Sequence, residues 1–427
     1  MSEAKLTKIQ ELIQIYQGGL EQVAQSQNAE DQVMAIIMKC LVDYFQETLR
    51  VAQERDKKIA WFMLAMPPEI LVAMDIHPYP SELLVGILPT IKSDNLTEYI
   101  NIAVQAGLPA EMCTVDKGTM GLLLSGQLPD PDFVIGTNLP CDNIVIGYQM
   151  YANLLKVPTY YSDSPYEAGI DDVDYFTGEI RRIMAFLEEH TGKKIDYDRL
   201  KGLIEESNRA AECLIEMNEL RKNIPCPMSA RLLPLIPFIN SFASSDSRQT
   251  QFYSMIRDAV QQSVQQGVGA VPEERNRVVW FMVPTYFDME VFPWMEQQFG
   301  AVIAMDMFSY GSIMPVDTSS NDEMIRGLAL KALNFPMIRQ LRGPVEFYTD
   351  DLVRVCEEYQ ADSVIFAGHE GCKHGWGILG LIRDVCKEMD KPLLVFDMDA
   401  FNGSPHAVAE VRRIIEEFFQ TLATAPA

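Results

Sequence analysis

The sequence lacks a long apolar run. None of its hydrophobic stretches reaches the roughly 18 residues of a membrane-spanning helix, and the polar beginning of the chain has no apolar segment typical of a signal peptide. Basic residues are in the minority, because 35 lysines and arginines face 60 aspartates and glutamates, a formal net charge of −25. This charge disfavours nucleic acid and anionic membranes as partners, since both are bound through basic patches. We therefore expect a cytoplasmic protein with neither kind of partner.

Closely spaced cysteine pairs are also missing. A structural zinc site typically has two cysteines separated by about two to four residues, and bacterial ferredoxins have a run of such cysteines. The eight cysteines of this chain contain neither pattern. In a reducing compartment disulfides are rare, so cysteines outside the core are more often metal ligands or catalytic groups.

Of the 427 residues 48% are apolar, enough for two or three domains with substantial cores. Residues 5–57 have the spacing of amphipathic helices. After them, short apolar runs typical of strands buried on both faces alternate with helical patterns, which favours a parallel sheet. The first half is expected to contain strands at 59–66, at LLVGIL (83–88), at 133–137 and at 157–163, and helices at 69–75, at 143–155 and at NLTEYINIAVQAG (95–107), where Asn95 is the expected cap and Gly107 the stop.

Residues 166–270 are mostly helical and charged, and the strand–helix alternation resumes at Arg277. We therefore predict an α/β protein with two Rossmann-like (flavodoxin-like) parallel-sheet domains. The predicted units are an N-terminal helical segment (1–57), a first α/β domain (58–165), a helical connecting region (166–275) and a second α/β domain (276–427).

The two α/β regions resemble each other in sequence. KIAWFMLAMP (58–67) matches RVVWFMVP (277–284), with Trp-Phe-Met in register, and PDFVIGTNLPCDN (131–143) matches ADSVIFAGHEGCKH (361–374). In the second match, a strand preceded by an acidic residue leads through a short loop to a cysteine. Cys141 and Cys372 are therefore expected at equivalent positions beyond strand C-terminal ends, where open parallel sheets form ligand sites.

Periodicity separates the cysteines into two groups. Four lie on apolar helix stripes and are expected in the core, namely Cys40, Cys213, Cys356 and Cys386. Cys226, between two prolines, is also expected to pack, with metal ligation as the alternative.

Three loop cysteines, Cys113, Cys141 and Cys372, each precede an expected helix. The partial positive charge of a helix N-terminus is expected to lower a thiol pKa and to offset the charge of a thiolate-bound cluster. Three thiolates from separate loops suit an iron–sulfur cluster in which one iron is not held by cysteine.

Several segments in order resemble one known family. GLPAEMC, PCDN and GHEGCK…KPLLVFDMD are similar to motifs of the 2-hydroxyacyl-CoA dehydratases, whose relatives include the cluster-bearing subunits of benzoyl-CoA reductase. PPEILVAMDIHPYP resembles the family's Pro-x-Glu-Leu segment, and ESNRAAECLIEMNELRKNIPCPMS resembles its Asn-x-x-Arg helix. The resemblance extends over nearly all of the chain after about residue 55.

The resemblance implies a heterodimer of two related subunits, each with a 4Fe–4S cluster, and a separate ATP-hydrolysing iron–sulfur activator. It implies that Cys113, Cys141 and Cys372 hold the cluster, whose open iron binds the carbonyl of an acyl-CoA substrate. The implied reaction is the radical elimination of water from a 2-hydroxyacyl-CoA to give an enoyl-CoA. One electron makes a ketyl radical that expels the hydroxyl, a base removes the β proton, and the electron returns.

The chain departs from the family where Asp-x-Asp-x-x-Asp-x-Arg often follows the last strand. Asn402 and Ser404 stand here in place of the last Asp and the Arg, which puts contacts with CoA or a partner subunit in question.

Other polar residues are candidates with ordinary alternatives. Glu69 could act near the cluster as a base, or could be a first-turn glutamate favoured by the helix dipole. His369, with Glu370 and His374, flanks Cys372 and could hydrogen-bond a cluster sulfur or the iron-bound ligand, or be solvated. His77 could be an acid–base group or a structural one. Asp142 is expected to cap its helix.

Rival functions remain at this point. The same cluster would suit a subunit of an ATP-dependent benzoyl-CoA-type reductase, acting on an aryl- or enoyl-CoA. It would also suit a cluster-carrying reductase that does not use CoA. Paired α/β lobes also occur in metal-free binding proteins.

Overall fold

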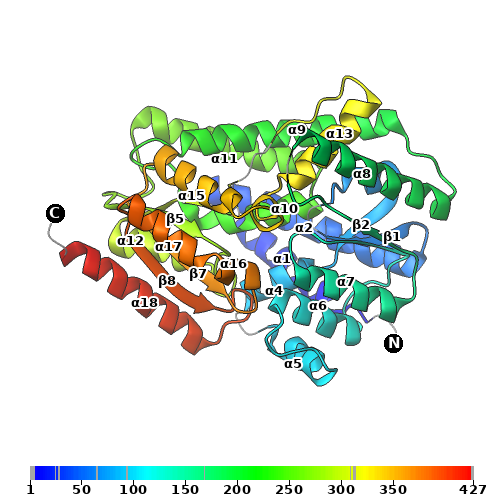
Figure 1. Ribbon diagram of the computed structural model, residues 1–427, viewed down its shortest axis with the longest axis horizontal. Coiled ribbons are helices and arrows are strands. Elements are labelled where there is room, and N and C mark those ends of the chain that lie inside the picture. Colours follow the sequence, from blue (N-terminus) through cyan, green and yellow to red (C-terminus); the bar gives the residue numbers. More distant parts are fainter. Residues whose placement is uncertain are drawn as a thin grey trace.

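The computed structural model describes residues 5–24, 26, 29–63, 66–92, 95–167, 169–307, 309–310 and 314–424. Two four-stranded parallel sheets lie on either side of a central region (Figure 1). The first consists of β1 (Lys58–Phe62), β2 (Ile76–Pro80), β3 (Phe133–Thr137) and β4 (Thr159–Ser162). The second consists of β5 (Asn276–Phe281), β6 (Ala301–Asp306), β7 (Ser363–His369) and β8 (Leu393–Met398). The predicted fold class, an α/β protein with two Rossmann-like domains, is therefore confirmed.

The internal repeat has a structural counterpart. The strand orders are β2-β1-β3-β4 and β6-β5-β7-β8, so each half runs in the same 2-1-3-4 order. Trp61 and Trp280, matched in the sequence repeat, are both fully buried. The acidic residue before the third strand serves the same purpose in both halves, because Asp132 accepts the backbone N–H of Ile59 at 2.9 Å and Asp362 accepts that of Arg277 at 2.7 Å.

Helices cover both faces of the sheets and connect the two halves. The first half contains α3 (Glu69–Ala73), α4 (Leu83–Ile91), α5 (Thr97–Gln105), α6 (Thr114–Leu124) and α7 (Asp142–Leu155). The second contains α12 (Val291–Phe299), α13 (Asn321–Leu333), α14 (Ile338–Leu341), α15 (Glu346–Glu358), α16 (Lys373–Gly377), α17 (Leu379–Glu388) and α18 (Pro405–Thr424).

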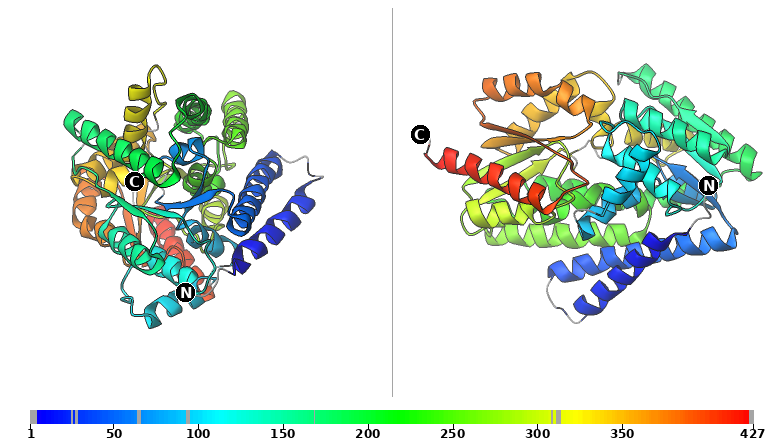
Figure 2. Two further views of the ribbon diagram at one scale, coloured as in Figure 1. Left: turned by 90° about the vertical axis from the view of Figure 1, so that its right-hand side faces the viewer. Right: turned by 90° about the horizontal axis from the view of Figure 1, so that it is seen from below.

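The remaining helices lie outside the two sheets. The first two, α1 (Thr7–Val23) and α2 (Ala29–Glu54), form a hairpin on one side of the molecule (Figure 2). Between the sheets in sequence come α8 (Ile170–Thr191), α9 (Tyr197–Leu220), a 3-10 helix (Ala230–Leu235), α10 (Ile236–Phe242) and α11 (Ser247–Gln266). This region is helical as predicted, whereas the exact domain boundaries stay predictions. Among the described helices, none combines the length and hydrophobicity needed to cross a bilayer.

The assignment of the second strand was wrong. LLVGIL is the beginning of α4, and the strand is the preceding segment IHPYP, which forms β2. Prolines normally disfavour a central strand because they cannot donate to the ladder, but among the described strands β2 lies at the edge of its sheet, next to β1. All residues of α4 from Leu83 to Pro89 are buried, so a helix with no polar face was indistinguishable from a buried strand.

Two smaller expectations near these segments had different outcomes. Asn95 does not cap α5; Leu96 takes the cap position, and the Asn95 side chain donates to the carbonyl of Leu88 at 3.0 Å. Gly107 ends the helix as expected, with a positive φ of 106°. Leu64 and Ala65, which belong to the expected strand 59–66, lie outside the described residues.

Candidate functional site

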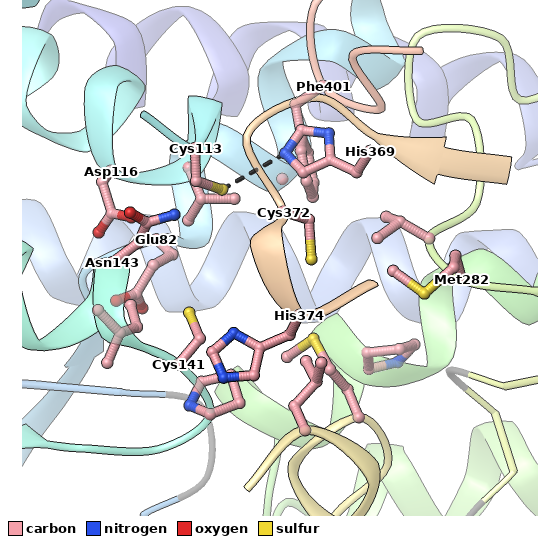
Figure 3. Close-up of a pocket in the computed structure, with 18 of the residues that line it drawn as sticks. Glu82, Cys113, Asp116, Cys141, Asn143, Met282, His369, Cys372, His374 and Phe401 are labelled. Carbon is pink, nitrogen blue, oxygen red and sulfur yellow. Dashed lines mark hydrogen bonds between the residues drawn. The ribbon is translucent and has the colours of Figure 1, made fainter. Parts of the chain in front are cut away.

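Three cysteines converge on one cavity between the two sheets. Cys113, Cys141 and Cys372 are the N-cap residues of α6, α7 and α16, so each precedes a helix as predicted. All three line a cavity of about 140 Å³ with largely apolar walls. Figure 3 shows their sulfur atoms directed toward the same space, with two thiols from the first half of the chain and one from the second.

A backbone contact brings the cysteine loops together. Gly371 has a positive φ of 78°, and a Cβ atom there would lie 2.8 Å from the backbone nitrogen of Cys113 and 2.9 Å from the carbonyl oxygen of Glu111. Only glycine permits this approach without strain. The contact is completed by Asn143, whose side-chain amide donates to the carbonyl of Gly371 at 3.1 Å.

Residues after β8 also connect the second half of the chain to the region around Cys113. Thr114 donates a hydrogen bond from its hydroxyl to the carboxylate of Asp399. Asn402, at the position where the chain departs from the family pattern, accepts a hydrogen bond from Thr97 at 2.9 Å. In this structure the segment therefore connects the second half of the chain to α5 and α6 of the first.

His369 is a neutral hydrogen-bond donor to one of the thiols. Its Nδ1 accepts the backbone N–H of Ala400 at 3.1 Å, which leaves the ring proton on Nε2. That Nε2 lies 3.4 Å from the Sγ of Cys113 (Figure 3). Burial, aided by the positive charge of Lys117, lowers the pKa of His369 to about 4, so the ring is uncharged near neutral pH.

The expectation that helix N-termini lower the pKa of these thiols is wrong for the protein alone. Burial raises the pKa of Cys113 well above its ordinary value, that of Cys141 to about 12, and also that of Cys372. Helix N–H groups act in the opposite direction, such as that of Gly375, 3.4 Å from the Cys372 sulfur, but burial outweighs them. Thiolates at these positions therefore need a nearby positive charge.

The donor set fits a multinuclear cluster better than a single metal ion. Within the described residues, no three His, Cys, Asp or Glu side chains are close enough together to hold one ion. The three thiols nevertheless line one cavity, which is the arrangement expected when several iron atoms separate the ligands. Metal coordination would also supply the positive charge that makes a buried thiolate stable.

Glu69 lies elsewhere. It is absent from the described lining of the cavity, and its Oε1 accepts from Lys331, from Ser207 at 2.7 Å and from Ser244 at 3.0 Å. Burial alone would raise the pKa of Glu69, but Lys331 and Ser207 outweigh it, and the net shift is downward. The residue thus ties α3 to α9 and α13 as an ionised structural group.

Two carboxyl groups that the sequence reasoning missed do line the cavity. Glu82 and Asp116 are 7% and 2% exposed. Oε1 of Glu82 accepts from Ser81 at 2.8 Å and from Tyr148 at 3.1 Å, whereas Oε2 of Glu82 and Oδ1 of Asp116 have no partner among the described residues. Burial raises the pKa of Glu82 to about 7 and, together with the nearby Glu82, that of Asp116 to about 8. For Asp116 the detectable signal was a pair of neighbouring charged residues, Asp116 and Lys117, within the helical segment TVDKGTMGLLL.

The other candidates separate by position. His374 lines the cavity, whereas Glu370 is absent from its described lining and contributes to a separate depression with Ala110 and Asp397. His77 is buried and its Nε2 lies 2.8 Å from the hydroxyl of Thr48, which is a structural role. Asp142 is the first residue of α7 and does not cap it, because Cys141 holds that position.

The remaining cysteines pack as expected. Cys226 is fully buried, with its Sγ 3.5 Å from the carbonyl of Met228, and it is not among the described residues that line the cavity. The four cysteines predicted for the core are buried, namely Cys40, Cys213, Cys356 and Cys386.

Comparison with known proteins places this site in a family. The family described as 2-hydroxyglutaryl-CoA dehydratase, D-component, matches residues 63–422. The chain belongs to this family. All three cavity cysteines lie within the matched residues, which begin directly after β1 and extend into α18.

Individual relatives are distant and differ in activity. One of the subunits of benzoyl-CoA reductase from Thauera aromatica is 22% identical over 342 residues, which cover 74% of this chain and 78% of that protein. The alpha subunit of lactoyl-CoA dehydratase from Anaerotignum propionicum is 22% identical over 369 residues, covering 78% and 84%. The (R)-phenyllactyl-CoA dehydratase alpha subunit of Clostridium sporogenes is 23% identical over 240 residues, covering 54% and 58%.

The close approach at Gly371 generates a prediction. Gly371→Ala should lower the free energy of unfolding by about 2 kcal/mol, because alanine is strained at positive φ and its methyl group would meet the Cys113 backbone. Gly377→Ala, in the adjacent helix, is the matched control, since no atom lies within 4 Å of its Cβ position. Chemical denaturation of both variants measures the difference. Equal midpoints would contradict the described contact.

Proposed function

We propose that this chain is the iron–sulfur subunit of a 2-hydroxyacyl-CoA dehydratase, which removes water from a 2-hydroxyacyl-CoA to give an enoyl-CoA. The carrying observation is the convergence of Cys113, Cys141 and Cys372 on one apolar cavity in a member of this family. Three cysteine ligands leave one iron of a four-iron cluster without a cysteine.

The cysteines would hold the cluster and the surrounding residues would control its environment. Bound there, a 4Fe–4S cluster would supply one electron and an open, Lewis-acidic iron for the thioester carbonyl. His369 donates its Nε2–H toward the Cys113 sulfur, a contact that stabilises negative charge on that ligand. The apolar walls exclude water that would otherwise intercept reactive species.

Glu82 replaces Glu69 as the candidate proton acceptor. The reaction removes a proton from the β carbon and a hydroxyl from the α carbon, and together they form the water that leaves. Ser81 and Tyr148 fix Oε1 of Glu82, which leaves Oε2 free to take the proton. A carboxyl whose pKa lies near 7 is suited to both accepting and releasing a proton at neutral pH.

Two protein partners belong to the proposal. The relatives above are each named as one subunit of a larger enzyme, which supports a second, related subunit for this chain. The family resemblance adds a separate ATP-hydrolysing iron–sulfur activator as the electron donor. Neither nucleic acid nor a membrane is proposed as a partner.

A benzoyl-CoA-type reductase subunit is the second candidate, because a relative of that name matches over most of its length. The two candidate functions are distinguished by an activity assay. A 2-hydroxyacyl-CoA and an aryl-CoA are each offered to the anaerobically purified protein together with its partner subunit and activator. We expect dehydration of the 2-hydroxyacyl-CoA. Conversion of the aryl-CoA alone would reject the dehydratase and support the reductase.

The cluster assignment predicts a difference between two cysteines on the same segment. Cys372→Ala should lose or degrade the cluster while the chain folds, because it removes one of three ligands. Cys386→Ala is the control, since this buried cysteine lies on α17 and not on the cavity. Iron content and the visible absorbance of anaerobically purified protein measure the effect. An intact cluster signal in Cys372→Ala would exclude it as a ligand.

The assignment of Glu82 as the base predicts that kcat/KM depends on pH. A base acts as its carboxylate, so kcat/KM should rise with pH until it passes the raised pKa near 7 and then level off. Glu82→Gln should lower kcat roughly 100-fold and abolish that rise.

Glu69→Gln is the matched control for this experiment, because it changes a buried glutamate outside the cavity. It should lower thermal stability and leave the pH profile in place. The assignment would be wrong if Glu69→Gln removed the rise with pH while Glu82→Gln kept it.

A further inference from the structure

The charged groups around the cavity are unevenly distributed. Its walls are mainly apolar side chains from both halves and the connecting region, including Met63, Val85, Phe238, Met282, Tyr286 and Phe401. The buried carboxyl groups in this lining belong to Glu82 and Asp116. Among the described lining residues no arginine is present, and the one lysine, Lys373, is solvent exposed.

We propose that this cavity accepts thioesters with an uncharged acyl chain, aliphatic or aromatic, and that Glu82 and Asp116 make it reject chains with a second carboxylate. The inference rests on the proposed function, because it concerns the acyl group of the same substrate. The proposed discrimination separates two chemical classes of acyl-CoA thioester. In one the acyl chain is uncharged, and in the other it ends in a second carboxylate.

The physical reason is the cost of an unpaired negative charge. A carboxylate moved from water into an apolar cavity loses its hydration and needs a cation or several donors in return. Glu82 and Asp116 show the effect on resident groups, because burial already raises the pKa of each. When ionised, at a pH above those values, their unpartnered oxygens add repulsion against a second carboxylate.

Uncharged chains meet the opposite conditions. A methyl or phenyl terminus gains from leaving water and contacting methionine and aromatic side chains, and it requires no hydrogen-bond partner. Met282 lies close to Cys372 at α16. A Cβ atom built on Gly375 would lie 2.3 Å from the Cε of Met282 and 3.3 Å from the sulfur of Cys372. The apolar wall therefore continues up to the thiols, where the reacting part of the acyl group would be.

The test uses two thioesters of equal chain length. Pentanoyl-CoA and glutaryl-CoA differ only in a terminal methyl against a carboxylate, and without a 2-hydroxyl group neither can be dehydrated. Calorimetric titration of the anaerobic holoenzyme, with CoA as the reference, measures binding without turnover. We expect pentanoyl-CoA to bind about 100-fold more tightly than glutaryl-CoA.

The outcomes separate this inference from the proposed function. Equal or tighter binding of glutaryl-CoA would overturn the inference and leave the dehydratase assignment standing. If neither thioester binds more tightly than CoA, the cavity is not an acyl site, and both are overturned.

Two variants test the cause of the discrimination. The double variant Glu82→Gln/Asp116→Asn should narrow the affinity ratio about tenfold, because amides can donate to the second carboxylate. Lys387→Met should leave the ratio unchanged, since this exposed lysine on α17 is not among the described residues that line the cavity. An unchanged ratio in the double variant, or a ratio that depends on Lys387, would overturn the role given to the two carboxyls.

Discussion

The close contact between Gly371 and the backbone of Cys113 is the constraint on which the site depends. The two sheets are separate. The first half of the chain supplies Cys113 before α6 and Cys141 between β3 and α7, and the second half supplies Cys372 between β7 and α16. A side chain at position 371 would keep these loops apart, whereas glycine lets the two backbones touch. The three thiols can therefore line one cavity although they are distributed over 260 residues of chain (372 − 113 + 1 = 260).

Burial is the second determinant, and it acts against negative charge throughout the cavity. It raises the pKa of all three thiols and of Glu82 and Asp116, and it keeps His369 neutral. A neutral imidazole can still donate from Nε2, so it supports a cysteine sulfur without adding a charge. In the proposed enzyme, the same apolar environment would favour radical chemistry on an uncharged chain and would bring the proton exchange of Glu82 near neutral pH.

Much of this arrangement could be predicted from the sequence because repeated patterns carry it. The Trp-Phe-Met match and the acidic residue before the third strand indicated two similar halves, and the strands of the two sheets indeed have the same order. Cys141 and Cys372 could be paired for the same reason. Periodicity also separated buried cysteines such as Cys386 from those at helix starts.

What could not be predicted depended on tertiary context. The segment LLVGIL has the pattern of either a strand or a helix, because all of its side chains are buried. The prolines of β2 are tolerated because β2 is an edge strand, and this position is known only from the sheet. Glu69 follows a strand as a catalytic group would, but a lysine 262 residues away in sequence holds it. Helix N-terminal charge suggested lowered thiol pKa values, yet burial, which the sequence does not report, decides their direction.

The most direct test of the cluster site is the iron and acid-labile sulfide content of the chain purified without oxygen. We predict about four iron atoms and four sulfides per chain, held by Cys113, Cys141 and Cys372. Protein that is folded, pure and free of iron and sulfide under these conditions would contradict the cluster site and the chemistry proposed for it.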